Sequence, residues 1–205
     1  MDVLEVIRKE RVVAVIRSER VADPAGLAQT LVDAGIHCVE FTFSIGAVLD
    51  AITEAIAVQD AIIGAGTVLH RSHATDAIAA GAKFVVTPTL IPDVAATSRE
   101  HGVPAILGGL SPTEVLAAHQ AGAAAVKLFP ANAGGPTYVR ALRGPFPNIP
   151  LIASGGIDRS NAHAYLEAGA VAVNAIDVVA PPDLVASGNH DEIRRNADAF
   201  LAAIR

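Results

Sequence analysis

Residues 105–128 read AILGGLSPTEVLAAHQAGAAAVKL, and this stretch places an amphipathic segment between two short apolar runs. Ser111-Pro112-Thr113-Glu114 has the residue types of a helix start: an N-capping hydroxyl, a proline in the first turn and a glutamate that closes the capping box. The Ala121-Gly122 pair is typical of a helix end, because glycine readily adopts the left-handed conformation found there. The stretch therefore predicts a strand, a helix and a second strand in close succession.

Apolar runs of this kind recur eight times, roughly every 23 residues, with segments of helical length between them. Each run is uninterrupted rather than alternating, which is typical of parallel strands that are buried on both faces. The predicted strands are Val12–Ile16, His37–Phe41, Ala61–Gly64, Phe84–Thr87, Ala105–Leu107, Ala124–Leu128, Leu151–Ala153 and Val171–Ala175. The predicted helices between them include Pro24–Ala34, Ala47–Ala57, His73–Ala80, Ile91–Glu100, Pro112–Ala121 and Asn161–Ala168.

Eight strand–helix units in one chain predict an α/β fold, a (β/α)8 TIM barrel that occupies residues 1–205 as a single domain. We expect Asp2–Arg8 to form an extra N-terminal helix across the barrel floor, and His190–Ile204 to form the eighth barrel helix. An open, doubly wound sheet is the alternative, but the even spacing of the units favours closure.

The composition argues against several classes of protein. An apolar content of 52% excludes a disordered chain, and a net charge of −6 without a basic stretch argues against nucleic acid as a partner. The single cysteine, Cys38, rules out an intrachain disulfide, and we expect it to be buried. No apolar run approaches the roughly 20 residues of a membrane span, and the N-terminal residues lack a signal-peptide pattern. We therefore expect a cytoplasmic protein with no membrane partner.

The residues that end the predicted strands carry the candidate chemistry, because a barrel places its site at the carboxyl ends of its strands. Lys127 is one of only three lysines and lies in an apolar run, AAAVKLFP, at 123–130. Loss of solvation there favours the neutral amine, which attacks a ketone to form a Schiff base. Glu40 is the only acid in the first seven strand cores, and it suits proton exchange with a substrate. The alternatives are a lysine that reaches solvent or pairs with a carboxylate, and a glutamate that only neutralises Lys127 or Arg17.

Two glycine-rich turns complete the candidate groups. Gly64-Ala65-Gly66-Thr67 offers a hydroxyl and exposed N–H groups, which suits a small carboxylate, although an ordinary tight turn has the same residues. Ser154-Gly155-Gly156 follows the seventh strand, where barrels often bind an anion or a phosphate. The seven histidines show no metal-ligand spacing, and we expect His70 and His73 to be exposed, so no metal site is predicted.

Seven stretches of the chain are informative in combination: Val13–Arg17, Val39–Phe43, Ile63–Leu69, Val85–Pro88, Val126–Pro130, Gly144–Asn148 and Gly155–Ile157. Together they resemble the class I pyruvate aldolases represented by 2-keto-3-deoxy-6-phosphogluconate aldolase and 4-hydroxy-2-oxoglutarate aldolase. The resemblance covers nearly the whole chain. It implies a (β/α)8 barrel that assembles as a homotrimer. It also implies a lyase that needs no cofactor and cleaves a 2-keto-4-hydroxy acid to pyruvate and an aldehyde.

The same resemblance implies roles for individual positions. Lys127 corresponds to the Schiff-base lysine of the family, and Glu40 corresponds to its general acid and base. Thr67 corresponds to a position that binds the pyruvate carboxylate, and Arg17 to one that binds substrate in some members. The remaining positions that the resemblance assigns to substrate binding are Pro88, Phe129, Ser154, Gly155 and Gly156.

Two positions depart from the family pattern. Ser44 stands where many members carry an arginine that helps to hold the carboxylate, and Arg17 is the residue expected to compensate. Ile176-Asp177 aligns with a Gly-Ser pair that holds the phosphate in phosphate-binding members. Because a carboxylate repels a phosphate dianion, an unphosphorylated 2-keto-3-deoxy sugar acid is an alternative substrate.

Two other functions fit parts of the sequence. Ser154-Gly155-Gly156 also fits a phosphate-sugar isomerase or a thiamin-phosphate-type synthase, neither of which needs a lysine imine. A catalytically inactive barrel that binds a small carboxylate is a third hypothesis, and only residues 176–177 favour it. Trapping of a pyruvate adduct with borohydride, read by intact mass, separates the aldolase from the isomerase and the synthase, whereas turnover of a 2-keto-4-hydroxy acid separates it from the inactive barrel.

Overall fold

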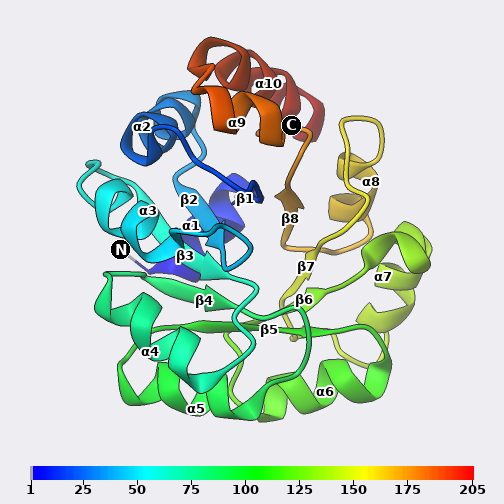
Figure 1. Cartoon of the computed structure of the whole chain (residues 1–205). Helices are drawn as coiled ribbons and strands as arrows, with labels where there is room; N and C mark the ends of the chain where they lie inside the picture. The colour runs from blue at the N-terminus through cyan, green and yellow to red at the C-terminus, as the bar shows by residue number, and fades with distance from the viewer. Residues whose placement is uncertain (1) are drawn as a thin grey trace.

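In the computed structural model, which describes residues 2–205, eight parallel strands close into a barrel (Figure 1). Met1, which the predicted domain includes, lies outside the described residues. Each strand pairs with the next along the chain, and the last strand closes on the first, where Val13 lies opposite Asn174. The strands are β1 Val12–Ile16, β2 Cys38–Thr42, β3 Ile62–Gly66, β4 Phe84–Val86, β5 Ala105–Gly109, β6 Ala125–Leu128, β7 Leu151–Ala153 and β8 Ala172–Ala175. The predicted barrel is confirmed, and the open sheet is wrong.

Helices surround the strands on all sides (Figure 1). They are α2 Pro24–Ala34, α3 Val48–Ala55, α4 Arg71–Ala79, α5 Pro92–Glu100, α6 Pro112–Gln120, α7 Gly135–Arg143, α8 Ala162–Glu167, α9 Pro182–Ser187 and α10 His190–Ile204. The predicted helices are confirmed, whereas α7, α9 and the short 3-10 helix η1, Ala131–Ala133, were not predicted. Within residues 2–205, no helix is both long enough and apolar enough to cross a membrane.

The predicted signals for helix starts and ends are present. The Ser111 hydroxyl accepts a hydrogen bond from the Glu114 N–H, and the Glu114 carboxylate accepts one from the Ser111 N–H at 2.7 Å. Hydrogen bonds from the backbone and side chain of Ser111, and from the backbone of Leu110, lower the pKa of Glu114. The glycines that follow four of the helices have φ values between +94° and +106°: Gly35, Gly81, Gly122 and Gly169. These conformations are the ones that the Ala-Gly pairs predict.

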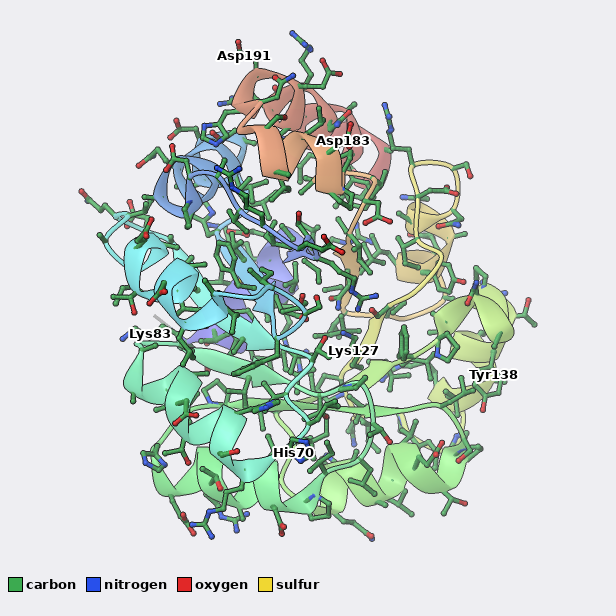
Figure 2. All side chains as sticks on the ribbon, in the orientation of Figure 1. His70, Lys83, Lys127, Tyr138, Asp183 and Asp191 are labelled. Atoms are coloured by element: carbon green, nitrogen blue, oxygen red, sulfur yellow. The ribbon has the colours of Figure 1, made fainter. Side chains whose placement is uncertain are left out.

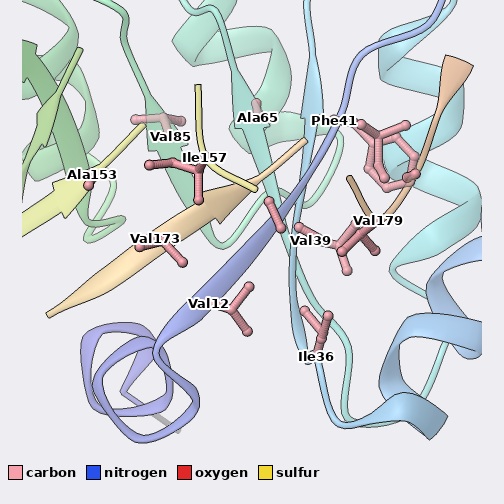
Figure 3. Packing of buried hydrophobic residues seen from close by; sticks show 14 of the residues in the cluster. Val12, Ile36, Val39, Phe41, Ala65, Val85, Ala153, Ile157, Val173 and Val179 are labelled. Atoms are coloured by element: carbon pink, nitrogen blue, oxygen red, sulfur yellow. The ribbon is translucent and has the colours of Figure 1, made fainter. Parts of the chain in front are cut away.

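The buried apolar residues form one cluster outside the strands and a second cluster inside them. The outer cluster packs the strands against the helices, and Figure 3 shows part of it, including Val12, Val39 and Val173. The inner cluster consists of Val13, Cys38, Ile62, Phe84, Val86, Ile106, Ala125, Ile152 and Ala172, together with Val6 and Ile7 of α1, Val3–Glu10. Because successive side chains of a strand alternate between its faces, the two clusters separate the inner face of the barrel from its outer face.

Helix α1 closes the amino-terminal end of the barrel, as predicted. Its residues Val6 and Ile7 pack against the inner cluster. Glu10, the last residue of α1, accepts a hydrogen bond from the His37 N–H at 2.9 Å and lies 2.6 Å from the His37 ring. Cys38 is buried as expected, and its burial, reinforced by the charge of Glu10, raises the pKa of its thiol to about 12. The amino-terminal half of the barrel interior is therefore apolar, and polar chemistry is left to the carboxyl ends of the strands.

Candidate active site

Lys127 and Glu40 approach each other inside the barrel from β6 and β2, which lie on opposite sides of the ring of strands. The Lys127 Nζ atom lies 3.8 Å from the Glu40 Oε1 atom, and the two residues are 3% and 1% exposed. This distance is within the range of an ion pair but longer than a hydrogen bond. Figure 2 shows Lys127 near the centre of the barrel, whereas Lys83 lies at the periphery. A lysine that reaches solvent is therefore wrong for position 127.

Neither carboxylate oxygen of Glu40 accepts a hydrogen bond from any group in residues 2–205. Buried carboxylates are normally satisfied by hydrogen-bond donors, because burial without them is costly. Space for this carboxylate comes from Gly66, since a Cβ atom on Gly66 would lie 1.8 Å from Oε1. The arrangement leaves both oxygens of Glu40 available to exchange protons with a molecule bound beside Lys127.

The ring of Phe129 forms a wall beside the amine. Its centroid lies 5.7 Å from the Lys127 Nζ atom, within the range of a cation–π contact. Gly155 packs against the same ring, because a Cβ atom on Gly155 would lie 3.2 Å from it. Gly155 and Gly156 both have positive φ values, of 94° and 72°. The turn after β7 therefore depends on two consecutive glycines, and it brings the backbone close to Phe129.

Pro88 belongs to a segment that folds over the neighbouring strand. A Cβ atom on Gly108 of β5 would lie 2.1 Å from the Pro88 carbonyl carbon. The Thr87 hydroxyl accepts a hydrogen bond from the Gly108 N–H at 3.0 Å and donates one to the Thr89 carbonyl at 2.6 Å. Glycine at 108 and the hydroxyl of Thr87 thus hold Pro88 over β5. This role of Gly108 and Thr87 was not predicted from the sequence, because it depends on a contact between adjacent strands.

Thr67 and Arg17 follow β3 and β1 directly. Thr67 is half-buried and has a φ of +54°, in the left-handed region that a β-branched residue rarely adopts. Such a conformation costs about 1–2 kcal/mol, and strained residues of this kind concentrate at functional sites. Arg17 is exposed at the end of β1. Both positions therefore lie at the carboxyl end of the barrel, with Lys127 and Glu40.

Ser154 is fully buried directly after β7, and its backbone is held by two hydrogen bonds. Its N–H donates to the Leu128 carbonyl at 3.0 Å, and its carbonyl accepts from the Ala131 N–H at 2.7 Å. Its hydroxyl oxygen accepts a hydrogen bond from the Asn174 side-chain amide of β8 at 3.2 Å. Asn174 is 2% exposed, and it is not among the predicted site residues. A single polar residue within the apolar run 171–175 is the signal that could have found it.

The two positions that depart from the resembled pattern lie after β2 and β8. The Thr42 hydroxyl donates a hydrogen bond to the Ile16 carbonyl at 3.0 Å and lies 2.6 Å from the Ser44 hydroxyl. Ser44 is exposed, Ile176 is half-buried and Asp177 is exposed. The segment after β8 therefore places an acidic side chain, and no glycine, at residues 176–177.

Two histidines lie together after β3. The ring of His73 stacks on Phe43 with a centroid distance of 4.2 Å, and His70 meets His73 edge-on at 5.0 Å. His70 is exposed as expected, but His73 is half-buried, so the expectation of an exposed ring is wrong for that residue. Burial first, and then the neighbouring His70, lower the pKa of His73. The stacking explains why His73 is less exposed than His70, because Phe43, in the loop after β2, covers one face of the His73 ring.

A cavity of about 880 Å³ opens at the opposite, amino-terminal end of the barrel. Residues before β3, β4 and β5 line it, including Asp60, Lys83 and Pro104. It contains none of the predicted site residues, and the side chains of Lys83 and Arg99 there are exposed rather than desolvated. The buried Lys127 amine, together with a Glu40 carboxylate that accepts no hydrogen bond from residues 2–205, makes the carboxyl end the candidate active site.

Comparison with known proteins identifies relatives of this chain. The family described as "KDPG and KHG aldolase" matches residues 3–196 of the chain. The 2-dehydro-3-deoxy-phosphogluconate aldolase of Treponema pallidum is 37% identical over 196 residues, which cover 94% of this chain and 93% of the relative. The KHG/KDPG aldolase of Escherichia coli is 32% identical, with 91% and 88% covered. The solved KDPG aldolase of Legionella pneumophila, with pyruvate captured as a covalent carbinolamine intermediate, is 27% identical, covers 98% of both chains and has a TM-score of 0.87.

Proposed function

The chain belongs to the KDPG and KHG aldolase family, and we propose how its own residues perform the reaction. The protein is a lyase, a class I pyruvate aldolase that cleaves a 2-keto-4-hydroxy acid such as 2-keto-3-deoxy-6-phosphogluconate or 4-hydroxy-2-oxoglutarate. The observation that carries the assignment of residues is the buried Lys127 amine, 3.8 Å from a carboxylate without hydrogen bonds. An imine-forming enzyme needs such a pair, because the amine attacks the substrate carbonyl and the carboxylate moves protons.

Lys127 is the nucleophile of the proposed mechanism. Its amine adds to the C2 carbonyl of the substrate, and loss of water gives a protonated imine. Glu40 accepts the proton of the C4 hydroxyl, directly or through a water molecule, while the electrons of the C3–C4 bond move into the imine and the aldehyde departs. The remaining enamine takes a proton at C3, and water then hydrolyses the imine to release pyruvate. The burial of both side chains keeps solvent from competing for these proton transfers.

The positions of the strands suggest how the substrate lies. Thr67 follows β3 and Ser154 follows β7, and these strands are on opposite sides of the eight-stranded ring. We assign the substrate carboxylate to Thr67 and Arg17, and the aldehyde half to Ser154 and the two glycines after it. Phe129 and Pro88 enclose the pyruvyl portion between them. The contact between Phe129 and the amine supports this placement.

Residues 176–177 bear on the aldehyde half that the enzyme accepts. Asp177 stands exposed at the carboxyl end of β8, where it opposes binding of a phosphate dianion. The two glycines after Ser154, both with positive φ, supply N–H groups that suit an anion instead. A panel that pairs each phosphorylated substrate with its unphosphorylated analogue, read as pyruvate release, decides whether the enzyme prefers a phosphorylated or an unphosphorylated substrate. Better turnover of the unphosphorylated compounds would support the alternative of a 2-keto-3-deoxy sugar acid.

Three further properties belong to the same proposal. The chain forms a single barrel domain, assembles as a homotrimer and works in the cytoplasm. The first is supported by the unbroken alternation of strands and helices around one barrel. The other two are supported only by membership of the family. Sedimentation or light scattering of the purified chain tests the trimer.

The decisive experiment compares Lys127→Ala with Lys83→Ala. Incubation with pyruvate and borohydride should add a stable adduct to the unmodified protein and to Lys83→Ala, but not to Lys127→Ala. Cleavage should fall by at least about a thousandfold in Lys127→Ala, because the covalent route is lost. Lys83 is a matched control, since it is an exposed lysine at the other end of the barrel. An active Lys127→Ala enzyme would overturn the assignment. An isomerase, a synthase or an inactive binding protein would each turn over no 2-keto-4-hydroxy acid.

A further inference from the structure

Asn174 is a buried polar residue for which the proposed mechanism has no use. It belongs to β8, and its neighbours on that strand, Val173 and Ala175, belong to the outer cluster. Ala172 belongs to the inner cluster, so alternation places Asn174 on the inner face of the barrel, one step closer to its carboxyl end. Lys127 and Glu40 occupy the corresponding inward positions of β6 and β2, after Ala125 and Cys38. Asn174 therefore lies in the polar half of the barrel interior.

Asn174 has one side-chain hydrogen bond within residues 2–205, and that bond ends on Ser154. The amide donates to the Ser154 hydroxyl oxygen at 3.2 Å, and both residues are at most 2% exposed. An apolar residue would fill a buried strand position without the desolvation penalty of an amide. The amide is therefore explained by what it does to Ser154 rather than by packing.

The direction of this hydrogen bond determines what Ser154 offers to a ligand. A serine hydroxyl has one proton to donate and two lone pairs that accept. Because the amide of Asn174 occupies a lone pair, the Ser154 proton must point away from Asn174. No group in the described part of the chain accepts that proton. The backbone of Ser154 is fixed to β6 and η1, so the hydroxyl has little freedom to point elsewhere.

We propose that Asn174 is a positioning residue, which acts through Ser154 by directing the serine proton to the C4 oxygen of the substrate. This inference rests on the proposed function, in which the aldehyde half lies beside Ser154. As the C3–C4 bond breaks, the C4 oxygen gains negative charge and becomes the aldehyde carbonyl. A donor aimed at that oxygen stabilises the transition state of cleavage. It has no partner when pyruvate alone forms an imine, because pyruvate has no C4.

A double-mutant cycle tests this coupling. The variants are Ser154→Ala, Asn174→Leu and the double variant, and each is assayed for cleavage of 2-keto-3-deoxy-6-phosphogluconate or, if that is a poor substrate, its unphosphorylated analogue. We expect Ser154→Ala to lower kcat about tenfold, the worth of one hydrogen bond, and Asn174→Leu to lower it about fivefold. The double variant should fall about tenfold and not about fiftyfold, because Asn174 acts only through Ser154. Borohydride trapping with pyruvate should stay within twofold of the unmodified enzyme in all three.

Two controls separate positioning from a loss of structure. Thr97→Val removes a buried side-chain hydrogen bond of α5 outside the barrel, and it should leave kcat unchanged. Thermal unfolding is measured for every variant, and Asn174→Val, which suits a buried strand, replaces Asn174→Leu if the latter does not fold.

The outcomes distinguish this inference from the proposed function. Additive losses in the double variant, or equal losses of cleavage and of pyruvate trapping in Asn174→Leu, would overturn the positioning role while leaving the aldolase assignment intact. Failure of the unmodified enzyme to trap pyruvate would overturn both. Unchanged cleavage in a folded Asn174→Leu enzyme would also exclude the role.

Discussion

Replacing Gly66 by alanine should disable Glu40 while leaving the reactive amine in place. The added methyl carbon would lie 1.8 Å from Glu40 Oε1, 2.5 Å from its carboxyl carbon and 2.6 Å from its Cγ atom. Gly66 is a strand residue without a positive φ, so the backbone itself accepts alanine. The carboxylate must therefore retreat by about 1.7 Å to reach an ordinary contact distance of about 3.5 Å. That movement is larger than the roughly 1 Å displacement that can lower a rate a hundredfold.

The expected loss follows from the role of Glu40. General acid–base catalysis contributes about 10²- to 10⁴-fold, so cleavage by Gly66→Ala should fall by about 10²- to 10³-fold. Imine formation depends on Lys127, so borohydride trapping with pyruvate should persist. Overpacking should lower the free energy of unfolding by about 1–3 kcal/mol, and the smaller entropy of the unfolded alanine chain should offset up to about 1 kcal/mol of this. The variant should therefore remain folded at room temperature.

Pyruvate release, coupled to a dehydrogenase, measures the cleavage, and thermal unfolding measures the stability. Gly46→Ala is the matched control, because a Cβ atom there would have no neighbour within 4 Å. Gly46 is exposed in the loop after β2, so its substitution should leave cleavage unchanged and should alter the stability only through the entropy of the unfolded chain, by up to about 1 kcal/mol. A folded Gly66→Ala enzyme that cleaves substrate within threefold of the unmodified rate would refute the reasoning, because the carboxylate would then not need its present place.

Three further predictions concern the frame around the site. The pKa of Cys38 rises from 9.0 to about 12 on folding, because the folded state favours the protonated thiol. The contribution of this thiol to the free energy of unfolding is complete below pH 9 and should be lost as pH rises towards 12. Denaturant titrations should show this loss in the unmodified protein but not in Cys38→Ala. Glu10→Ala leaves the His37 N–H unpaired and should lower the free energy of unfolding by about 1–3 kcal/mol with unchanged cleavage; an unchanged melting temperature would contradict this. Gly108→Ala forces a methyl against the backbone of Pro88 and should cost about 3 kcal/mol in urea unfolding, whereas a stable variant would show that the loop moves freely.

The sequence predicts the strands well because every strand of this barrel is buried on both faces. An uninterrupted run such as Val12–Ile16 has few alternatives once turn signals bound it, and the observed strand has the same limits. Lys127 and Glu40 were also predictable, because a charge within an apolar run needs a reason. Helix α7 was not predicted, since Gly134, Gly135 and Pro136 are typical of a loop, although proline also suits the first turn of a helix.

The sequence marks Asn174 as a polar residue in an apolar run, but what Asn174, Thr87 and Gly108 each do could not be predicted, because it depends on a contact between neighbouring strands. The hydrogen bond from Asn174 to Ser154 joins β8 to the end of β7, and the bond from Gly108 to Thr87 joins β5 to the end of β4. Periodicity assigns a side chain to a face of a strand but does not give its register against the next strand. Stacking of His73 on Phe43 was missed for the same reason, since the two residues follow different strands.

Register also explains how an eight-stranded barrel accommodates its two charged side chains. The interior of such a barrel is just wide enough to be filled by side chains, which leaves little room for a substrate. Glu40 lies opposite Gly64 of β3 in register, and Lys127 lies opposite Gly108 of β5. Gly64 also gives way to the ring of Phe84, which a Cβ atom there would approach to 2.4 Å. Each charged residue thus has a glycine beside it on a neighbouring strand, and the ring of Phe84 and the backbone of Pro88 fill the space that a Cβ atom on these two glycines would take. The same pairing indicates why Gly66, the next inward position after Gly64, tolerates no methyl group while Glu40 keeps its place.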